Sequence, residues 1–133
     1  MGPLDKYVLA DDALTATPDG FDLRFRSHWY RSLPLSCMGV KVQLDGAELA
    51  PEDITLEANG HHYALSELPN LSEEWLFILD AATLHLKRPT ASPAGQAHQV
   101  ALTLDLYIPY ILVGAEGSPL LASTRVAKSL ISR

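Results

Sequence analysis

Apolar and polar residues alternate along much of the chain, which is typical of β-strands that turn one face to a core. The alternation is clearest over residues 21–25, 40–44 and 75–79. The longest stretch covers residues 100–108, where every second residue is Val, Leu or Ile. We expect this stretch to form a strand near the centre of a sheet.

Turn-forming residues separate these stretches at regular intervals. Asn59-Gly60 lies between two alternating runs, and Asn-Gly tolerates the positive φ angles of a type I′ turn, so residues 54–65 are predicted to form a hairpin. Turns recur about every 8–12 residues, which favours an all-β fold. We therefore expect an antiparallel β-sandwich of about eight to ten short strands, in a single domain that covers residues 1–133.

Three segments are harder to interpret. Residues 71–79 contain a possible helix cap, but their apolar run is rich in strand formers, so we expect a strand after a short turn. Residues 89–97 are rich in Pro, Ala and Gly, and we expect a mobile hairpin tip there. For residues 118–133 we expect a last strand around 121–126, followed by an extended or helical tail.

The apolar run at residues 107–114 is interrupted by a proline. Pro109 cannot donate a hydrogen bond to a neighbouring strand, so it marks a sheet edge or a β-bulge. An apolar edge needs a cover. The chain's own C-terminal segment and another subunit are equally suitable covers.

The overall charge argues against two classes of partner. Sixteen acidic and ten basic residues give a net charge of −6, which repels phosphate, so we expect no nucleic-acid and no anionic membrane surface.

The sequence has neither a secretory signal at its start nor an apolar run of about 20 residues, and we expect a cytoplasmic protein. Hydrophobic residues make up 47%, which indicates a generous core or a surface for a partner.

Residues with catalytic or metal-binding chemistry are sparse. A single cysteine, Cys37, excludes an internal disulfide and any multi-cysteine metal site. His61 and His62 are adjacent and would point to opposite faces of a strand. His85 and His98 flank residues 89–97 and could meet across a hairpin, but no acidic residue has a convincing third-ligand spacing. We expect neither a metal site nor a catalytic residue in this chain.

The densest segment of binding-type residues covers positions 24–31. It holds three of the six arginines, with a Trp and a Tyr between them, and these residue types are enriched at binding hot spots. The alternative is that the arginines pair with acids of the same chain and that the Trp lies in the core. We expect a subunit interface formed by Arg24, Arg26, His28, Trp29, Tyr30, Arg31 and Tyr110. Glu74 and Trp75 are candidates for contact with a substrate.

Three segments together resemble one known family. They read LTATPDGFDLRFRSHWYRSLPLSC (14–37), ELPNLSEEWLFILD (67–80) and LDLYIPYILVG (104–114). They resemble the small β subunit of bacterial C-glycoside deglycosidases, and the likeness spans nearly the whole chain.

The resemblance implies a heteromeric enzyme, a heterodimer or a larger assembly. The α subunit is expected to be a TIM barrel with a bound divalent metal, expected to be manganese. The substrate is then a C-glycoside already oxidised at position 3 of the sugar. A base of the α subunit removes the C2 proton while the metal polarises the ketone, and the C–C bond breaks by elimination. The β subunit is expected to pack on the barrel and to supply no catalytic residue.

Two other functions remain open from the residues alone. The chain could be a free carbohydrate-binding β-sandwich that uses Trp29, Tyr30 or Trp75 as stacking platforms. It could also be a small metal-dependent enzyme that uses His85 and His98.

Overall fold

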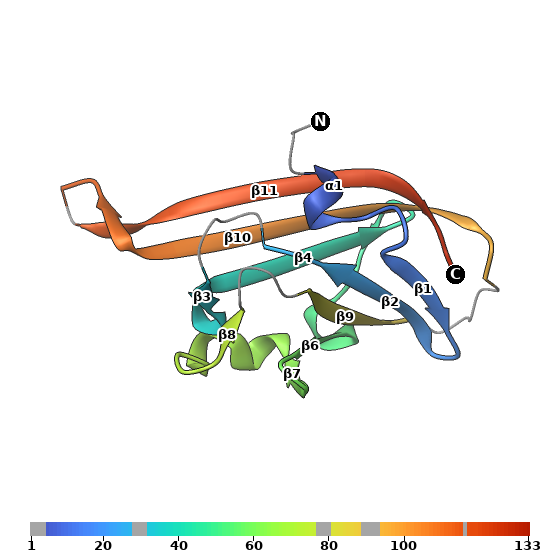
Figure 1. Cartoon of the computed structure of the whole chain (residues 1–133), viewed down its shortest axis with the longest axis horizontal. Helices are drawn as coiled ribbons and strands as arrows, with labels where there is room; N and C mark the ends of the chain where they lie inside the picture. The colour runs from blue at the N-terminus through green and yellow to red at the C-terminus, as the bar shows by residue number, and fades with distance from the viewer. Residues whose placement is uncertain (1–4, 28–31, 77–80, 89–93, 116) are drawn as a thin grey trace.

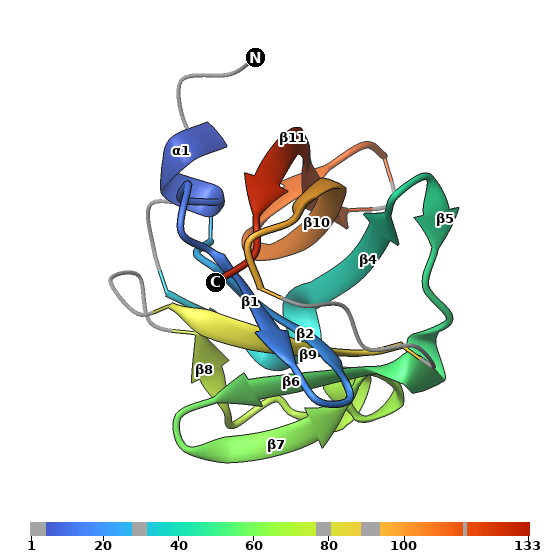
Figure 2. The same cartoon turned by 90° about the vertical axis from the view of Figure 1, so that its right-hand side faces the viewer.

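Two antiparallel sheets pack face to face in the computed structural model of this chain (Figures 1 and 2). The structure describes residues 5–27, 32–76, 81–88, 94–115 and 117–133. Eleven strands and one short helix, α1 (Asp5–Val8), lie in these residues. The all-β class and the antiparallel sandwich are therefore confirmed, although two of the strands are much longer than expected.

The first sheet has five strands in the order β1-β2-β9-β6-β7. Their bounds are β1 (Leu14–Thr17), β2 (Gly20–Phe25), β6 (Ile54–Ala58), β7 (His61–Ala64) and β9 (Ala82–Lys87). The β6–β7 hairpin is confirmed: Asn59 and Gly60, between the two strands, have φ angles of 55° and 78°, as a type I′ turn requires.

The second sheet has four strands in the order β11-β10-β4-β5. Their bounds are β4 (Met38–Leu44), β5 (Ala47–Glu48), β10 (Ala97–Val113) and β11 (Ser118–Ile131). β10 lies between β11 and β4, so the central position expected for residues 100–108 is confirmed.

A third, two-stranded ribbon lies at one end of the sandwich. It pairs β3 (Leu33–Pro34) with β8 (Trp75–Leu76). Short 3₁₀ turns cover Leu35–Cys37, Pro51–Asp53 and Leu65–Asn70. β8 follows the last of these turns, as expected for residues 71–79, of which 77–79 lie outside the described residues.

The core lies between the two main sheets and draws on both. Leu23, Leu56 and Leu84 of the five-stranded sheet are fully buried, and so are Val42 and Leu102 of the four-stranded sheet. They belong to one continuous cluster of buried side chains. The alternation read from the sequence therefore identifies the inward-facing rows correctly.

The end of the chain differs from the expectation. β11 is a continuous strand as far as Ile131, so the prediction of a short strand followed by a tail is wrong. Residues 97–108 pair with residues 120–131, which keeps the whole segment extended. Beyond β11, Arg133 exchanges two backbone hydrogen bonds with β1: its N–H donates to Leu14, and its carbonyl accepts from Ala16. The C-terminus thereby connects the two sheets.

The connection between β9 and β10 also differs. β9 belongs to the five-stranded sheet and β10 to the four-stranded sheet, so the prediction of a hairpin tip at residues 89–97 is wrong. The connection crosses from one sheet to the other, and residues 89–93 lie outside the described residues. Alternation shows which side chains face the core, but both strands have inward-facing rows, so it does not assign a strand to a sheet.

Candidate functional site

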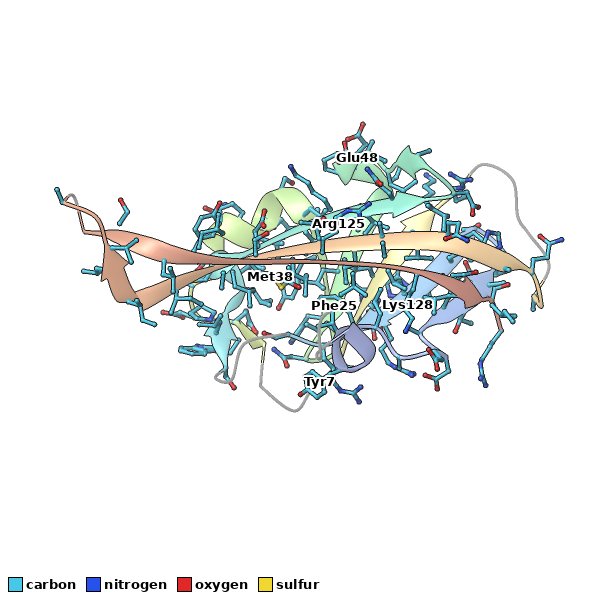
Figure 3. The ribbon with its side chains drawn as sticks, turned by 90° about the horizontal axis from the view of Figure 1, so that it is seen from above. Tyr7, Phe25, Met38, Glu48, Arg125 and Lys128 are labelled. Atoms are coloured by element: carbon cyan, nitrogen blue, oxygen red, sulfur yellow. The ribbon has the colours of Figure 1, made fainter. Side chains whose placement is uncertain are left out.

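A two-stranded arm projects from one end of the four-stranded sheet. β4 begins at Met38, which pairs with Leu106, and β10 and β11 continue beyond that point. We define the arm as residues 107–121. Figure 1 shows it extending past the rest of the molecule, and Figure 3 shows the same two strands continuing beyond the labelled Met38.

The arm carries an exposed apolar surface. Tyr107, Leu112, Val113 and Leu121 are 45%, 62%, 44% and 48% exposed. They are four of the seven large hydrophobic residues that are exposed in the described part of the chain. Tyr107 and Leu121 are cross-strand partners, so their side chains share one face. Exposed apolar side chains gathered on one element are typical of interaction surfaces.

A β-bulge interrupts the arm near its base. The pairing of β10 with β11 shifts register between Ile108 and Leu112, the interval that contains Pro109. This confirms that the proline marks an irregular position. The cover along the edge of β10 is β11, so the chain's own C-terminal segment fills that role. A bulge increases local twist, which turns the distal arm relative to the sheet.

Trp75 lies on β8, in the two-stranded ribbon that β8 forms with β3. Its side chain is 41% exposed, while its backbone oxygen accepts a hydrogen bond from Nδ2 of Asn59 at 2.7 Å. The Glu74 carboxylate accepts a hydrogen bond from the hydroxyl of Tyr63. Partial burial and this carboxylate both raise the pKa of Tyr63. Glu74 is thus engaged within the chain, whereas the side chain of Trp75 is exposed among the described residues.

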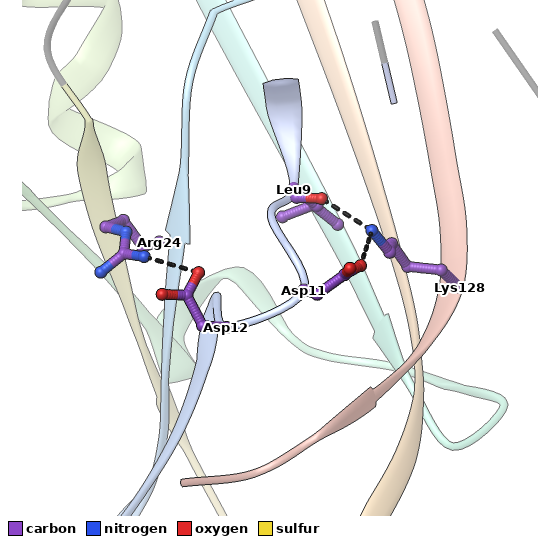
Figure 4. A network of polar contacts seen from close by, with 5 residues as sticks. All are labelled: Leu9, Asp11, Asp12, Arg24 and Lys128. Atoms are coloured by element: carbon purple, nitrogen blue, oxygen red, sulfur yellow. Dashed lines mark hydrogen bonds and ion pairs between the residues drawn. The ribbon is translucent and has the colours of Figure 1, made fainter. Parts of the chain in front are cut away.

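Arg24 has an acidic partner inside the chain. Its Nη2 lies 3.0 Å from Oδ1 of Asp12, as Figure 4 shows. The same N-terminal segment is held by Lys128 of β11, whose Nζ donates to the backbone oxygen of Leu9 at 2.8 Å and to Asp11 at 3.0 Å. Charged residues at 11–12 therefore connect the N-terminal segment to both sheets.

The remaining predicted interface residues are only partly placed. The guanidinium of Arg26 lies 5.8 Å from the centre of the Tyr7 ring, which is within cation–π range. His28, Trp29, Tyr30 and Arg31 lie outside the described residues, and so does the side chain of Tyr110. The ion pair of Arg24 with Asp12 agrees with the alternative considered from the sequence, whereas the partner of Arg26 is an aromatic ring and not an acid. A subunit interface at these positions stays a prediction.

A polar cluster on the five-stranded sheet was missed from the sequence. Asp22, Glu57, His62 and His85 meet on the face opposite the core. His85 Nδ1 lies 2.6 Å from Asp22 Oδ1, and His85 Nε2 lies 2.7 Å from Glu57 Oε1. His62 Nε2 lies 3.0 Å from the same Glu57 oxygen. The four residues come from β2, β6, β7 and β9, and only the strand pairing brings them together.

The ionisation of this cluster follows from these contacts. Burial alone would lower the pKa of His85, but hydrogen bonds to Glu57 and Asp22 outweigh it and raise that pKa. The hydrogen bond from His85 lowers the pKa of Glu57 despite partial burial. Both shifts favour a proton on the ring between two carboxylates.

The expected meeting of His85 and His98 is wrong. His85 is on β9 and His98 is on β10, in different sheets. His98 is buried and its Nδ1 donates to Oδ2 of Asp45 at 2.8 Å. Among the described residues, Nε2 of His98 is the one buried side-chain nitrogen or oxygen that has no hydrogen-bond partner.

Comparison with known proteins decides the family. A family model described as the C-glycoside deglycosidase β subunit matches residues 4–110. This chain belongs to that family. The match ends inside the arm.

Curated relatives are also named as β subunits of deglycosidases. A 3′-dehydrocarminate deglycosidase β subunit of Microbacterium sp is 35% identical over 114 residues, which cover 85% of this chain and 83% of the relative. C-glycoside deglycosidase β subunits of Microbacterium trichothecenolyticum and Arthrobacter globiformis are 37% and 38% identical over 89 residues. Those two alignments cover 66% and 65% of this chain, and 66% of each relative.

The family name places the chain in an enzyme that has more than one kind of subunit. Among the described residues, no helix has the length and apolar character needed to cross a membrane.

Proposed function

We propose that this chain is the non-catalytic β subunit of a C-glycoside deglycosidase, a carbon–carbon lyase that works as a heterodimer or larger assembly. The partner is a TIM-barrel α subunit, and the substrate is a 3-oxo-C-glycoside. The α subunit would hold the divalent metal, manganese, which would supply Lewis-acid polarisation of the sugar ketone. The cytoplasmic location also stays a prediction.

One observation on this chain carries the proposal beyond the family name. Four large apolar residues of the arm, Tyr107, Leu112, Val113 and Leu121, are exposed in the isolated chain, on strands that extend past the rest of the molecule. A monomer gains nothing from such a surface, whereas a subunit loses the exposure on assembly. We propose that the arm packs against the α subunit, and that the exposed side chain of Trp75 belongs to the same contact.

The chain offers a matched pair of variants to test this contact. Leu112 lies on the part of β10 that belongs to the arm, and Ile131 is the last residue of β11, far from the arm. Their exposed fractions are 62% and 60%. Leu112→Asp should weaken binding of the α subunit at least tenfold, about 1.4 kcal/mol, because the assembled complex would bury a carboxylate in an apolar contact. Ile131→Asp should leave binding unchanged. Titration calorimetry of the two purified subunits measures both dissociation constants.

Activity assays test the rest of the proposal. The isolated chain should not cleave a 3-oxo-C-glycoside, and addition of the α subunit should give cleavage. Cleavage by this chain alone would contradict the non-catalytic role. Equal effects of Leu112→Asp and Ile131→Asp on assembly would contradict the contact through the arm. Binding of simple glycosides by the isolated chain would instead favour a carbohydrate-binding module.

A further inference from the structure

The polar cluster on the outer face of the five-stranded sheet is built by strands and not by loops. β2, β9, β6 and β7 are consecutive in the sheet, and each contributes one side chain. Asp22 is the cross-strand partner of His85, and Glu57 is the partner of His62. Glu57 lies two residues beyond Thr55, which is the partner of His85 on β6. Pairing within the sheet therefore fixes all four positions.

Three of these residues have the geometry of a ligand set. Glu57, His62 and His85 each present one ligand atom, and these atoms all lie within 4.8 Å of one another. The rings of His62 and His85 are stacked, with centroids 5.3 Å apart and planes inclined by 29°. The two imidazoles and the carboxylate are thus already gathered around one point.

The hydrogen bonds of His85 leave a place for a cation between its Nε2 and the carboxylate of Glu57. A neutral imidazole has one N–H and one lone pair. If Nδ1–H donates to Asp22, the lone pair on Nε2 faces the carboxylate of Glu57 at 2.7 Å. Two electron-rich atoms at this distance repel each other unless a cation lies between them, either a proton on Nε2 or a metal ion that takes its place. A histidine that donates one ring N–H to a carboxylate while its other nitrogen binds a metal is a recurrent arrangement in metal sites.

We propose that Glu57, His62 and His85 bind a Zn²⁺ ion, and that Asp22 orients the ring of His85. Two imidazole nitrogens and one carboxylate oxygen suit Zn²⁺ better than they suit Mg²⁺ or Ca²⁺, which prefer oxygen ligands alone. Three protein ligands leave a fourth tetrahedral position for water.

The surroundings of the cluster favour a positive ion. Asp22, His62 and His85 line an open hollow of about 690 Å³. Three further carboxylates, those of Asp19, Glu52 and Asp53, line the same hollow, and Lys87 is the one basic residue among the lining residues apart from the two histidines. The hollow therefore has an excess of negative charge and room for a bound water.

Metal binding has a mechanical consequence in this sheet. β7 is a four-residue edge strand that pairs only with β6 among the described residues. An ion bound by His62, Glu57 and His85 would link three neighbouring strands, β7, β6 and β9. Zn²⁺ should therefore raise the melting temperature of the chain, because it binds the folded sheet and not the unfolded chain.

The test uses the full chain, free of any histidine tag and stripped of metal with a chelator. Titration calorimetry with Zn²⁺ should give one ion per chain, and Zn²⁺ should raise the melting temperature. His62→Ala should weaken the affinity at least tenfold. His61→Ala is the matched control: it is also exposed and lies on the same strand, but it points to the other face, so its affinity should equal that of the unchanged chain.

Asp22→Asn distinguishes a positioning residue from a ligand. It should weaken Zn²⁺ binding about 10–100-fold and change the visible spectrum of bound Co²⁺ less than Glu57→Gln does, because Asp22 does not touch the ion. Circular dichroism confirms that each variant is folded. If His85→Ala does not fold, His62→Ala on the edge strand still decides the result.

Two results would overturn the proposal. One is the absence of Zn²⁺ binding at micromolar concentration, which would leave a proton as the cation between the carboxylates. The other is an equal loss of affinity in His61→Ala and His62→Ala. Both measurements need only this chain, so their failure leaves the subunit role untouched. Conversely, Leu112→Asp should bind Zn²⁺ normally.

Discussion

At the scale of single residues, Asp45 shows how a turn and a buried side chain support each other. Its φ angle is 52°, and it starts the turn between β4 and β5. Its carboxylate accepts hydrogen bonds from His98 Nδ1 at 2.8 Å and from the backbone N–H of Gln99 at 2.9 Å. Partial burial would raise the pKa of Asp45, but these two hydrogen bonds bring it below the usual 3.8.

Asp45→Asn should therefore lower stability in a pH-dependent way. Asn tolerates the left-handed conformation and still accepts a hydrogen bond, so the variant removes the charge and little else. Because the pKa is lowered in the folded chain, the charge stabilises above the usual value of 3.8, and this stabilisation is lost as the pH falls through the folded pKa. With solvent screening we expect a loss of at most about 1 kcal/mol at pH 7.

Urea unfolding of the two proteins at several pH values measures this difference. The difference between the urea midpoints of the two proteins should disappear as the pH falls below about 3.8. A gap that stays constant or widens toward acid pH would show that the charge of Asp45 is not what stabilises this turn.

At the scale of elements, the arm and the sandwich are distinct in how they are stabilised. Ile108 is fully buried and is the last residue of β10 in the core cluster. Beyond it, Ile111 is half-buried and packs against the cluster from outside, and Leu112 and Val113 are exposed. The sandwich therefore depends little on the distal arm, although the arm continues the same two strands.

The pairing of Ile108 with Leu120 allows a clean removal of the distal arm. Replacing residues 109–119 by Asn-Gly would join these two partners through a two-residue turn. We expect a folded chain that has lost most of its affinity for the α subunit. Circular dichroism with urea unfolding tests the fold, and co-purification tests the assembly. A shortened chain that assembles normally would exclude the distal arm as the contact.

The sequence predicts well those structural features that depend on residues close together in the chain. The alternation locates the inward-facing rows, Asn59-Gly60 locates a hairpin, and Pro109 locates a bulge. The sequence does not predict which strands pair across long separations. The cluster of Glu57, His62 and His85 was missed for that reason, since each residue occupies an ordinary polar position on its own strand.

At the scale of the whole molecule, both sheets contribute to one cluster of buried side chains. Leu56 of the five-stranded sheet and Leu102 of the four-stranded sheet are both fully buried in it. Neither sheet covers its apolar face without the other, which supports the prediction of a single domain.

Leu56→Ala and Leu102→Ala should therefore lower the midpoint of the same unfolding transition. Each should cost about 2–5 kcal/mol, because each leaves a cavity in the shared core. Calorimetric scans of the two variants and the unchanged chain should each show one transition. Two separate transitions, each sensitive to only one of the variants, would contradict the single domain.

The two backbone hydrogen bonds of Arg133 have a consequence for how copies of the chain behave toward each other. They occupy the N–H of Ala16 and the carbonyl of Leu14 on the side of β1 that faces away from β2. Unoccupied strand edges of this kind recruit strands from other molecules and seed aggregation. Arg133 thus prevents this edge of β1 from pairing with strands of other molecules. We expect a variant that ends at Ile131 to expose the edge of β1 and to self-associate.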